Sequence, residues 1–231
     1  MIYGLIMCAG NQTRFELNIP KALVDINDEK LLDINIKNLN DYCDKVYVVV
    51  SNSNKEFFTN YDNTIEISSG LGCGDAVMKA LRTLKLKKKD TCYIIWGDSL
   101  PTKNIYSSCI SSYNGNVIVP CVKENTPYVQ IVQKENDKLE IRFSKFNDKI
   151  EKGYHDLCVF YGNAKEIYKH CEEFYIKFFV KDKYIHKHNE FSFLDIFNDT
   201  DIKGNIVELD NATSHSFNTL DELKDMLRGD L

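Results

Sequence analysis

An apolar run near the start of the chain constrains the fold more than any other sequence feature. The run extends from Tyr3 to Ala9 and breaks at Gly10. A short segment that is apolar on both faces predicts a central strand of a parallel sheet, because helices cover both faces of such a sheet. Ligands bind at the carboxyl ends of strands in open α/β sheets, so we expect the loop after Ala9 to face a ligand.

Similar runs recur through the first half of the chain. Residues 45–51 are mostly β-branched, and 64–68 and 92–96 are two shorter apolar runs. A segment with mostly helical spacing at 30–42, and a second predicted helix that begins after Gly74, separate these runs. The resulting β-α-β rhythm predicts an α/β fold, a Rossmann-like three-layer α/β/α arrangement with a mixed, mostly parallel sheet.

The second half of the chain has a different pattern of predicted elements, with closely spaced strand-like runs before a long helix. The predicted strands are 117–122, 128–134, 138–143 and 155–161, and the predicted helices are 164–180 and 190–197. The sequence contains no internal repeat, no low-complexity linker and no clean domain boundary. The 231 residues are therefore predicted to form one domain, with halves at 1–115 and 116–231.

The loop that follows the first run has the composition of a polyphosphate-binding loop. It carries Gly10, Asn11, Thr13 and Arg14, and Lys21 follows. Glycine allows close approach of the backbone, free N–H groups can face phosphate oxygens, and the two cations add charge. Solvated surface cations after an ordinary strand are the alternative. The loop lacks the Gly-Lys-Ser/Thr of a P-loop and the later glycines of the dinucleotide fingerprint.

A second glycine-rich segment precedes the second predicted helix. Glycines occupy positions 70, 72 and 74, and Asp75 is the predicted N-cap of the helix. Taken alone, this pattern is typical of a flexible turn before a capped helix.

A carboxylate follows the run at 92–96. Gly97 and Asp98 come directly after it, so Asp98 is expected at the same edge of the sheet as Gly10. An aspartate that only caps a turn is the alternative.

Composition narrows the class of partner and the compartment. The formal net charge of −5 argues against a general nucleic-acid binder, which would carry a basic excess. The eight cysteines include no Cys-x-x-Cys pair, and several lie in apolar runs, so we expect free thiols in a reducing, cytoplasmic compartment. No apolar run approaches the ~20 residues of a membrane span, so no membrane partner is expected. The sequence does not indicate an oligomeric state.

Taken in order, these motifs resemble the signature of the nucleotidyltransferases that join a nucleoside triphosphate to a phosphorylated acceptor. That signature is Leu-x-Ala-Gly-x-Gly-x-Arg and then Pro-Lys, and the matching residues are Ala9, Gly10, Thr13, Arg14, Pro20 and Lys21. Gln12 stands where the second glycine is usual. A family segment Leu-Gly-Thr-Gly-x-Ala is matched by Leu71, Gly72, Gly74 and Ala76, with Cys73 in place of Thr. Asn218 falls on the Asn or Asp of a family tail motif.

The resemblance implies a role for each matching position. It implies that Arg14 and Lys21 are catalytic, that Cys8, Ala9, Gly10, Asn11, Thr13, Gly72, Cys73 and Gly74 bind the nucleotide, and that Asp98 and Asn218 hold Mg²⁺. It also implies a nucleotide-binding half at 1–115 and an acceptor-binding half at 116–231. For Asn218, an N-cap of a C-terminal helix is an alternative that is compatible with metal binding.

Two departures from the family's sugar transferases bear on the acceptor. Val129 and Cys158 stand where those enzymes commonly carry glycine. The chain is thus more similar to the non-sugar branch, in which cytidylyltransferases use CTP with phosphocholine, or with phosphoglutamine in bacterial capsule phosphoramidate pathways. Asp156 could pair with an ammonium group of such an acceptor, and Lys145 could meet its anionic part.

Three other functions remain open. A sugar-1-phosphate nucleotidyltransferase would share the same motifs. A family-A glycosyltransferase would share the sheet, although it normally shows Asp-x-Asp where this chain has Asp98-Ser99-Leu100. A non-catalytic nucleotide-binding module would account for Gln12. His186 and His188 lie in a lysine-rich segment, where we expect them to be solvated rather than to bind metal.

Overall fold

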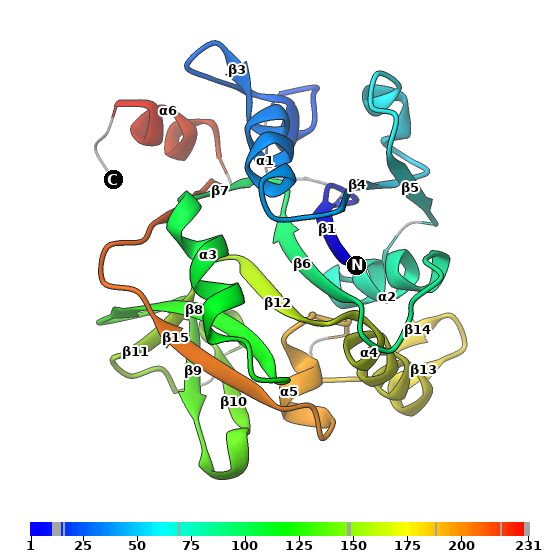
Figure 1. Cartoon of the computed structure of the whole chain (residues 1–231), viewed down its shortest axis with the longest axis vertical. Coiled ribbons are helices and arrows are strands. Elements are labelled where there is room, and N and C mark those ends of the chain that lie inside the picture. The colour runs from blue at the N-terminus through cyan, green and yellow to red at the C-terminus, as the bar shows by residue number, and fades with distance from the viewer. Residues whose placement is uncertain are drawn as a thin grey trace.

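The computed structural model describes residues 1–10, 15, 17–68, 70–146, 149–187, 189–217 and 219–228 (Figure 1). A ten-stranded sheet runs through the molecule. Its strands are β1 (Ile2–Met7), β4 (Lys45–Ser51), β5 (Thr64–Ile67), β6 (Thr91–Trp96), β8 (Val117–Glu124), β9 (Val129–Gln133), β10 (Leu139–Phe143), β11 (Gly153–Asp156), β12 (Val159–Asn163) and β15 (Gly204–Glu208). The helices are α1 (Leu31–Asn40), α2 (Cys73–Thr83), α3 (Lys103–Ser112), α4 (Ala164–Phe178), α5 (Asp195–Asp199) and α6 (Leu220–Arg228).

The strand order is β10-β9-β11-β8-β12-β6-β1-β4-β5, and β15 pairs with β8. Strands β4, β1 and β6 are parallel neighbours, and Met7 of β1 pairs with Val49 on one side and Trp96 on the other. Strands β10, β11 and β12 run against the remaining strands, so the sheet is mixed and largely parallel. The strands of residues 116–231 thus extend the sheet that the first half begins.

The chain reverses its direction of travel across the sheet at β1. From β1 it passes through α1 to β4 and β5, and α2 then carries it back to β6 on the opposite side of β1. Ligand sites in open α/β sheets lie beyond the carboxyl ends of strands at such a switch point. The fold therefore places the residues that follow β1 and β6 beside one another.

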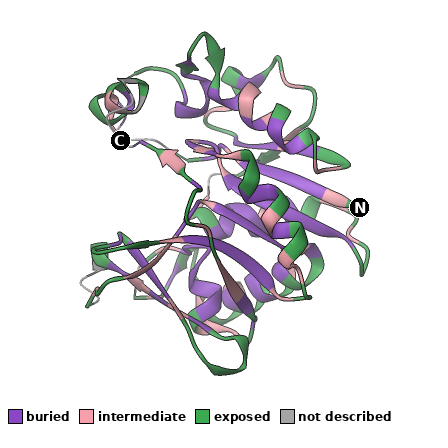
Figure 2. Ribbon diagram, turned by 60° about the vertical axis from the view of Figure 1, so that its left-hand side comes forward, coloured by how far each residue is buried: buried purple, intermediate pink, exposed green. Residues whose placement is uncertain are grey.

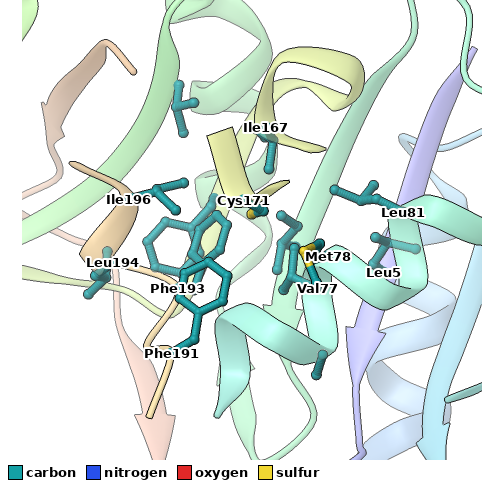
Figure 3. Packing of buried hydrophobic residues seen from close by; sticks show 14 of the residues in the cluster. Leu5, Val77, Met78, Leu81, Ile167, Cys171, Phe191, Phe193, Leu194 and Ile196 are labelled. Atoms are coloured by element: carbon teal, nitrogen blue, oxygen red, sulfur yellow. The ribbon is translucent and has the colours of Figure 1, made fainter. Parts of the chain in front are cut away.

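Helices cover both faces of the sheet, as the period-two alternation of a buried strand requires. Leu5 of β1 packs with α2 and α4 on one face, whereas Ile6 packs with α1 and α3 on the other. Figure 3 shows the first of these layers, with Leu5, Val77 and Leu81 beside Cys171. Most of the buried residues lie along the strands and inner helix faces (Figure 2), so the predicted three-layer α/β/α architecture is confirmed.

Three pairs of short strands lie outside the ten-stranded sheet. They are the β2–β3 hairpin (Asp25–Ile26 and Glu29–Lys30), β7 (Ser99–Pro101), which pairs with β16 (Ser214–Ser216), and the β13–β14 hairpin (Phe179–Val180 and Lys183–Tyr184). The pairing of β7 with β16 brings the end of the chain back to the residues that follow β6. None of the described helices is long and apolar enough to cross a bilayer.

Two predicted elements differ from the observed ones. The strand expected at 155–161 is divided into β11 and β12, because Cys158 adopts a left-handed backbone with φ of 58° that a continuous strand excludes. The helix expected at 190–197 begins only at Asp195, after a turn at residues 193–194. Before that turn, the backbone pairs with the 71–74 loop, where Phe191 N–H donates to the Leu71 carbonyl at 2.9 Å.

The predicted roles of Asp75 and His186 are also wrong. Helix α2 begins at Cys73 with Gly72 as its N-cap, and Asp75 lies inside the first turn. Asp75 is buried, and it accepts hydrogen bonds from Leu71 N–H and the Tyr184 hydroxyl while pairing with Lys79. His186 is not solvated, because its side chain is 5% exposed and lies 3.1 Å from Asp199. His188 lies outside the described residues.

Candidate nucleotide-binding crevice

A cavity of about 470 Å³ opens at the carboxyl ends of β1 and β6. Two glycine-containing walls enclose it. The first wall consists of Gly10, Ala22, Gly97 and Asp98, and the second consists of Gly70, Gly72, Cys73 and Glu190. Met7, Cys8, Ala9, Ala76 and Trp96 complete the lining. Small residues and backbone thus dominate the cavity, and in the described part of the chain its charged lining residues are Asp98 and Glu190.

Lys21 organises the first wall. It begins a short 3₁₀ turn, Lys21–Leu23, and its buried ammonium lies 3.0 Å from Asp98 Oδ2. The same ammonium donates to the Phe217 carbonyl at 2.7 Å and lies over the Phe217 ring. The Lys21 side chain is 6% exposed and that of Asp98 is 35% exposed, so the carboxylate, and not the ammonium, faces the cavity.

Asp98 fits the role of a magnesium ligand on the chemistry of its wall. Mg²⁺ binds oxygen donors, usually one or two protein carboxylates together with phosphate oxygens of the substrate. Asp98 is a part-exposed carboxylate that lines a cavity large enough for a phosphorylated ligand. The residues present are therefore compatible with the metal that the sequence motif implies.

Four predicted site residues fall outside the described part of the chain. They are Asn11, Thr13, Arg14 and Asn218. Phe217, which precedes Asn218 in the sequence, is described and shares Lys21 with Asp98. The tail therefore reaches the first wall at Phe217. The roles of the four residues stay predictions.

The end of β1 is held in place by backbone contacts. Cys8 N–H donates to the Val49 carbonyl at 2.8 Å, and the Cys8 carbonyl accepts from Asn54 Nδ2 at 2.7 Å. The Cys8 thiol is buried and its pKa is raised by desolvation, with a further contribution from Asp98. A neutral, packed thiol contributes shape to the cavity rather than charge. Asn54 lies shortly after the run at 45–51, so its position near the end of a predicted strand could have suggested that it lies at the same edge of the sheet as Cys8.

The second wall depends on close packing between its glycines and Phe191. A Cβ on Gly72 would lie 2.3 Å from the Phe191 carbonyl oxygen, and Gly72 has φ of 112°. A Cβ on Gly74 would lie 2.6 Å from the Phe191 ring, and the Gly74 N–H donates to the Phe191 carbonyl at 2.9 Å. Gly72 lines the cavity, whereas Gly74 does not. Glycine is therefore required at both positions because any larger side chain would collide with Phe191, whether or not a nucleotide is bound.

Cys73 joins the same contact from the helix side. Its sulfur accepts from Phe193 N–H at 3.2 Å and lies 3.9 Å from the Ser192 hydroxyl. Figure 3 shows Phe191 and Phe193 beside the first turns of α2. The segment 190–193 is thus the outer support of the second wall. Glu190 was not among the predicted site residues, because no local pattern links it to residues more than a hundred positions earlier.

The acceptor candidates lie in different surroundings from those expected. Asp156 is buried, accepts from Cys158 N–H at 3.0 Å and has its pKa raised by desolvation. It does not line the cavity, whereas Lys145 reaches the second wall by an ion pair of 2.9 Å with Glu190. Neither Val129 nor Cys158 lines the cavity. Val129 packs into the core, and Cys158 lies at the break between β11 and β12, where its φ is positive. The expectation that they fill the space of a sugar stays a prediction.

The fold has close counterparts among solved structures. They include HddC from Yersinia pseudotuberculosis (TM-score 0.71, 17% identity, 100% of each chain covered) and CTP:phosphocholine cytidylyltransferase (LicC) from Streptococcus pneumoniae (TM-score 0.74, 14% identity, 100% of this chain and 99% of that chain). The inositol-1-phosphate CTP transferase from T. maritima is similar over 98% of this chain and 93% of that chain (TM-score 0.73, 15% identity). At these identities the likeness establishes the fold alone.

The family assignment comes from the sequence. No curated protein sequence matches the chain. The family model for the MobA-like NTP transferase domain matches residues 4–183, well over half of the 231 residues. The matched region contains most of β1, Lys21 and Asp98 at the first wall, the 70–74 loop and β12. With its sheet, its switch-point cavity and this match, the chain belongs to the MobA-like NTP transferase family.

Proposed function

We propose that this chain transfers CMP from CTP to a small phosphorylated acceptor that is not a sugar, and releases pyrophosphate. The observation that carries the proposal is the first wall, where Lys21 and Asp98 meet beside Gly10 at the switch point of the sheet. A cation, a carboxylate and a glycine loop at one place suit a metal-bound triphosphate. Among proteins of similar fold, HddC was solved with GMP-PN, and two others are named for their use of CTP.

The reaction needs positioning and charge neutralisation. A phosphate oxygen of the acceptor attacks the α-phosphorus and forms a new P–O bond, while the bond to the bridging oxygen breaks and its electrons leave with pyrophosphate. The attacking phosphate is already ionised, so no general base is required. Mg²⁺, when held by Asp98 and Asn218, supplies positive charge to the phosphates. Lys21 holds Asp98 in place, and Arg14 would meet the leaving pyrophosphate.

The acceptor is proposed to be phosphoglutamine or a phosphocholine-like molecule, as in capsule phosphoramidate pathways. The resemblance to the non-sugar branch supports this class. The Lys145 ammonium, which lies at the second wall through its pair with Glu190, could meet the phosphate of such an acceptor. Asp156 lacks this support because it is buried and does not line the cavity.

A substrate screen tests the proposal. Each of CTP, UTP, ATP and GTP is combined with phosphoglutamine, phosphocholine, inositol-1-phosphate or glucose-1-phosphate, with Mg²⁺, and pyrophosphate release is measured. We expect CTP with a non-sugar acceptor to give the highest rate. Preferential consumption of glucose-1-phosphate would refute the acceptor class while leaving nucleotidyl transfer intact. Absence of pyrophosphate in every combination, with retention of a hexose from a nucleotide-sugar donor, would identify a glycosyltransferase instead.

A further inference from the structure

We propose that Glu190 selects the base of the nucleotide by accepting a hydrogen bond from the exocyclic amino group of cytosine. The inference rests on the proposed function, and it adds a specificity residue from a segment far from any nucleotide motif. Glu190 lines the switch-point cavity beside Gly72 and Cys73. In the proposed function the first wall binds the phosphates and the metal. No role in nucleotide binding has yet been given to the Glu190 carboxylate on the second wall.

Charge determines which part of the nucleotide Glu190 can meet. The proposed function places the metal-bound triphosphate at Asp98 on the first wall, and the Glu190 carboxylate repels phosphates that approach the second wall. The uncharged end of the nucleotide then lies toward the second wall, which consists of small residues and backbone apart from Glu190. A carboxylate can only accept hydrogen bonds, and so it requires a donor on the base.

The pyrimidines differ at the position where such a donor is needed. Cytosine carries an amino group at C4, whereas uracil carries a carbonyl oxygen, and carboxylates pair with the cytosine amino group in nucleic-acid recognition. A uracil carbonyl facing Glu190 would place two acceptors together without a proton between them. Glu190 therefore favours CTP over UTP by attraction to one base and repulsion of the other.

The surrounding contacts hold Glu190 in place for this role. Its neighbour Phe191 exchanges backbone hydrogen bonds of 2.9 Å with Leu71 and Gly74, so the Glu190 backbone moves with the second wall. The Lys145 ammonium lies 2.9 Å from Glu190 Oε1 and restricts where the side chain can lie. The Glu190 side chain is 41% exposed, which leaves it accessible to a ligand.

The test compares Glu190→Gln with a matched control. Glutamine has the shape of glutamate, but its amide can donate as well as accept, so it should tolerate either pyrimidine. The control is Glu66→Gln, which removes a charge from an ion pair with Lys55 of the same 2.9 Å length away from the cavity. Both variants remove part-exposed carboxylates and are expected to fold.

Two readouts separate base selection from catalysis. The first is the ratio of kcat/KM for CTP and UTP with the best acceptor from the screen. The second is binding of CTP and UTP without acceptor, followed by the fluorescence of Trp96, the single tryptophan of the chain and a lining residue of the cavity. We expect the wild-type preference for CTP to fall by about tenfold or more in E190Q and to persist in E66Q.

The outcomes distinguish this inference from the function on which it rests. An unchanged CTP-to-UTP ratio in E190Q would overturn the role of Glu190 even if the enzyme is active. A rise in acceptor KM alone would also overturn it, and would assign Glu190 to a cationic group of the acceptor. If no pyrophosphate is released but E190Q abolishes selective CTP binding, the role of Glu190 stands and nucleotidyl transfer fails.

Discussion

Two cavities of the described structure differ in what surrounds them. The switch-point cavity, about 470 Å³, has a lining of small residues with two carboxylates. A second cavity, about 710 Å³, lies beside β10 and α5, and its lining is richer in charge. Its lining residues are Glu140, Ile141, Arg142, Lys149, Glu151, His186, Lys187, Asn198 and Asp199. By volume and charge alone, the second cavity would be chosen as the binding site.

Position in the sheet reverses that choice. In the second cavity Arg142 pairs with Glu140 at 2.6 Å, and Lys149 pairs with Glu151 at 2.8 Å. The carboxylates of the switch-point cavity are paired as well, so pairing does not distinguish the two cavities. Asp98 differs because it follows the carboxyl end of a central strand. The comparison teaches that position at the carboxyl end of the sheet, rather than size or number of charges, indicates the site.

The largest expected effect belongs to Asp98. Asp98→Asn keeps the size of the side chain but removes the charge that a metal requires. We expect pyrophosphate release to fall by about 100-fold or more, roughly 2.7 kcal/mol of barrier. Steady-state kinetics with CTP give the loss, and thermal unfolding checks that the fold persists. Activity within about tenfold of wild type would remove the distinction between the two cavities.

Lys21 should rank second. Lys21→Met removes the ammonium that joins Asp98 to the Phe217 carbonyl. Because the ammonium positions the carboxylate that we propose as the metal ligand, we expect kcat to fall by roughly 10- to 100-fold, with a smaller rise in KM. The change also leaves the Phe217 carbonyl without this donor, which should cost about 1–3 kcal/mol of stability. An effect confined to KM would make Lys21 a ground-state phosphate anchor.

Gly72 tests the second wall of the switch-point cavity. Gly72→Ala would place its Cβ 2.3 Å from the Phe191 carbonyl oxygen, at a backbone φ of 112° that alanine rarely adopts. We expect a loss of about 2 kcal/mol or more in the free energy of unfolding, together with weaker CTP binding. Urea unfolding and Trp96 fluorescence measure the two effects. Unchanged stability would mean that segment 190–193 moves freely away from the loop.

Asp195 tests the buried charges behind the second cavity, where His186 Nδ1 lies 3.7 Å from its Oδ2. Burial raises the pKa of Asp195 from 3.8 to about 7. The folded state then binds more protons than the unfolded state between these values, so the free energy of unfolding falls as pH rises through this window, by at most about 1.4 kcal/mol per pH unit. Above about pH 7 the loss levels off.

Asp195→Asn should remove this dependence. Burial lowers the pKa of His186, which works in the opposite sense as pH falls below 6.5, so the readout is the difference between variant and wild type. We expect that difference to grow in favour of Asp195→Asn by about 1 kcal/mol or more between pH 5 and pH 7. Urea unfolding at pH 5, 6 and 7 measures it. A difference that does not change with pH would contradict the raised pKa.

The smallest effect is expected at Lys149, which lines the second cavity and is 85% exposed. Lys149→Gln should change kcat/KM by less than about twofold, because an exposed pair contributes little and no substrate is expected there. The same kinetic assay used for Asp98→Asn gives the value. A loss above about tenfold would move the substrate toward the second cavity.

Much of the fold follows from local pattern. The run at 45–51 coincides with β4, and the other central runs differ from β1, β5 and β6 by one or two residues at their ends. Side chains on these strands alternate between two helical layers, so burial on both faces leaves a continuous apolar signal. Chain order and periodicity were therefore sufficient to place Gly10 and Asp98 at one edge of the sheet. The positive φ of Cys158 left no comparable signal, and the break between β11 and β12 was missed.

The composition of the crevice needed the tertiary structure. Lys21 and Phe217 are 196 residues apart in the chain, yet one hydrogen bond joins them. Glu190 reaches the cavity because Phe191 fits against Gly72 and Gly74, a contact that close packing and backbone hydrogen bonds create together. The local sequence pattern predicts which segments form buried strands and where those strands end, because both depend on residues that are close together in the chain. The partner of a buried ammonium or a wall glycine depends on how distant segments pack, and only the folded chain determines it.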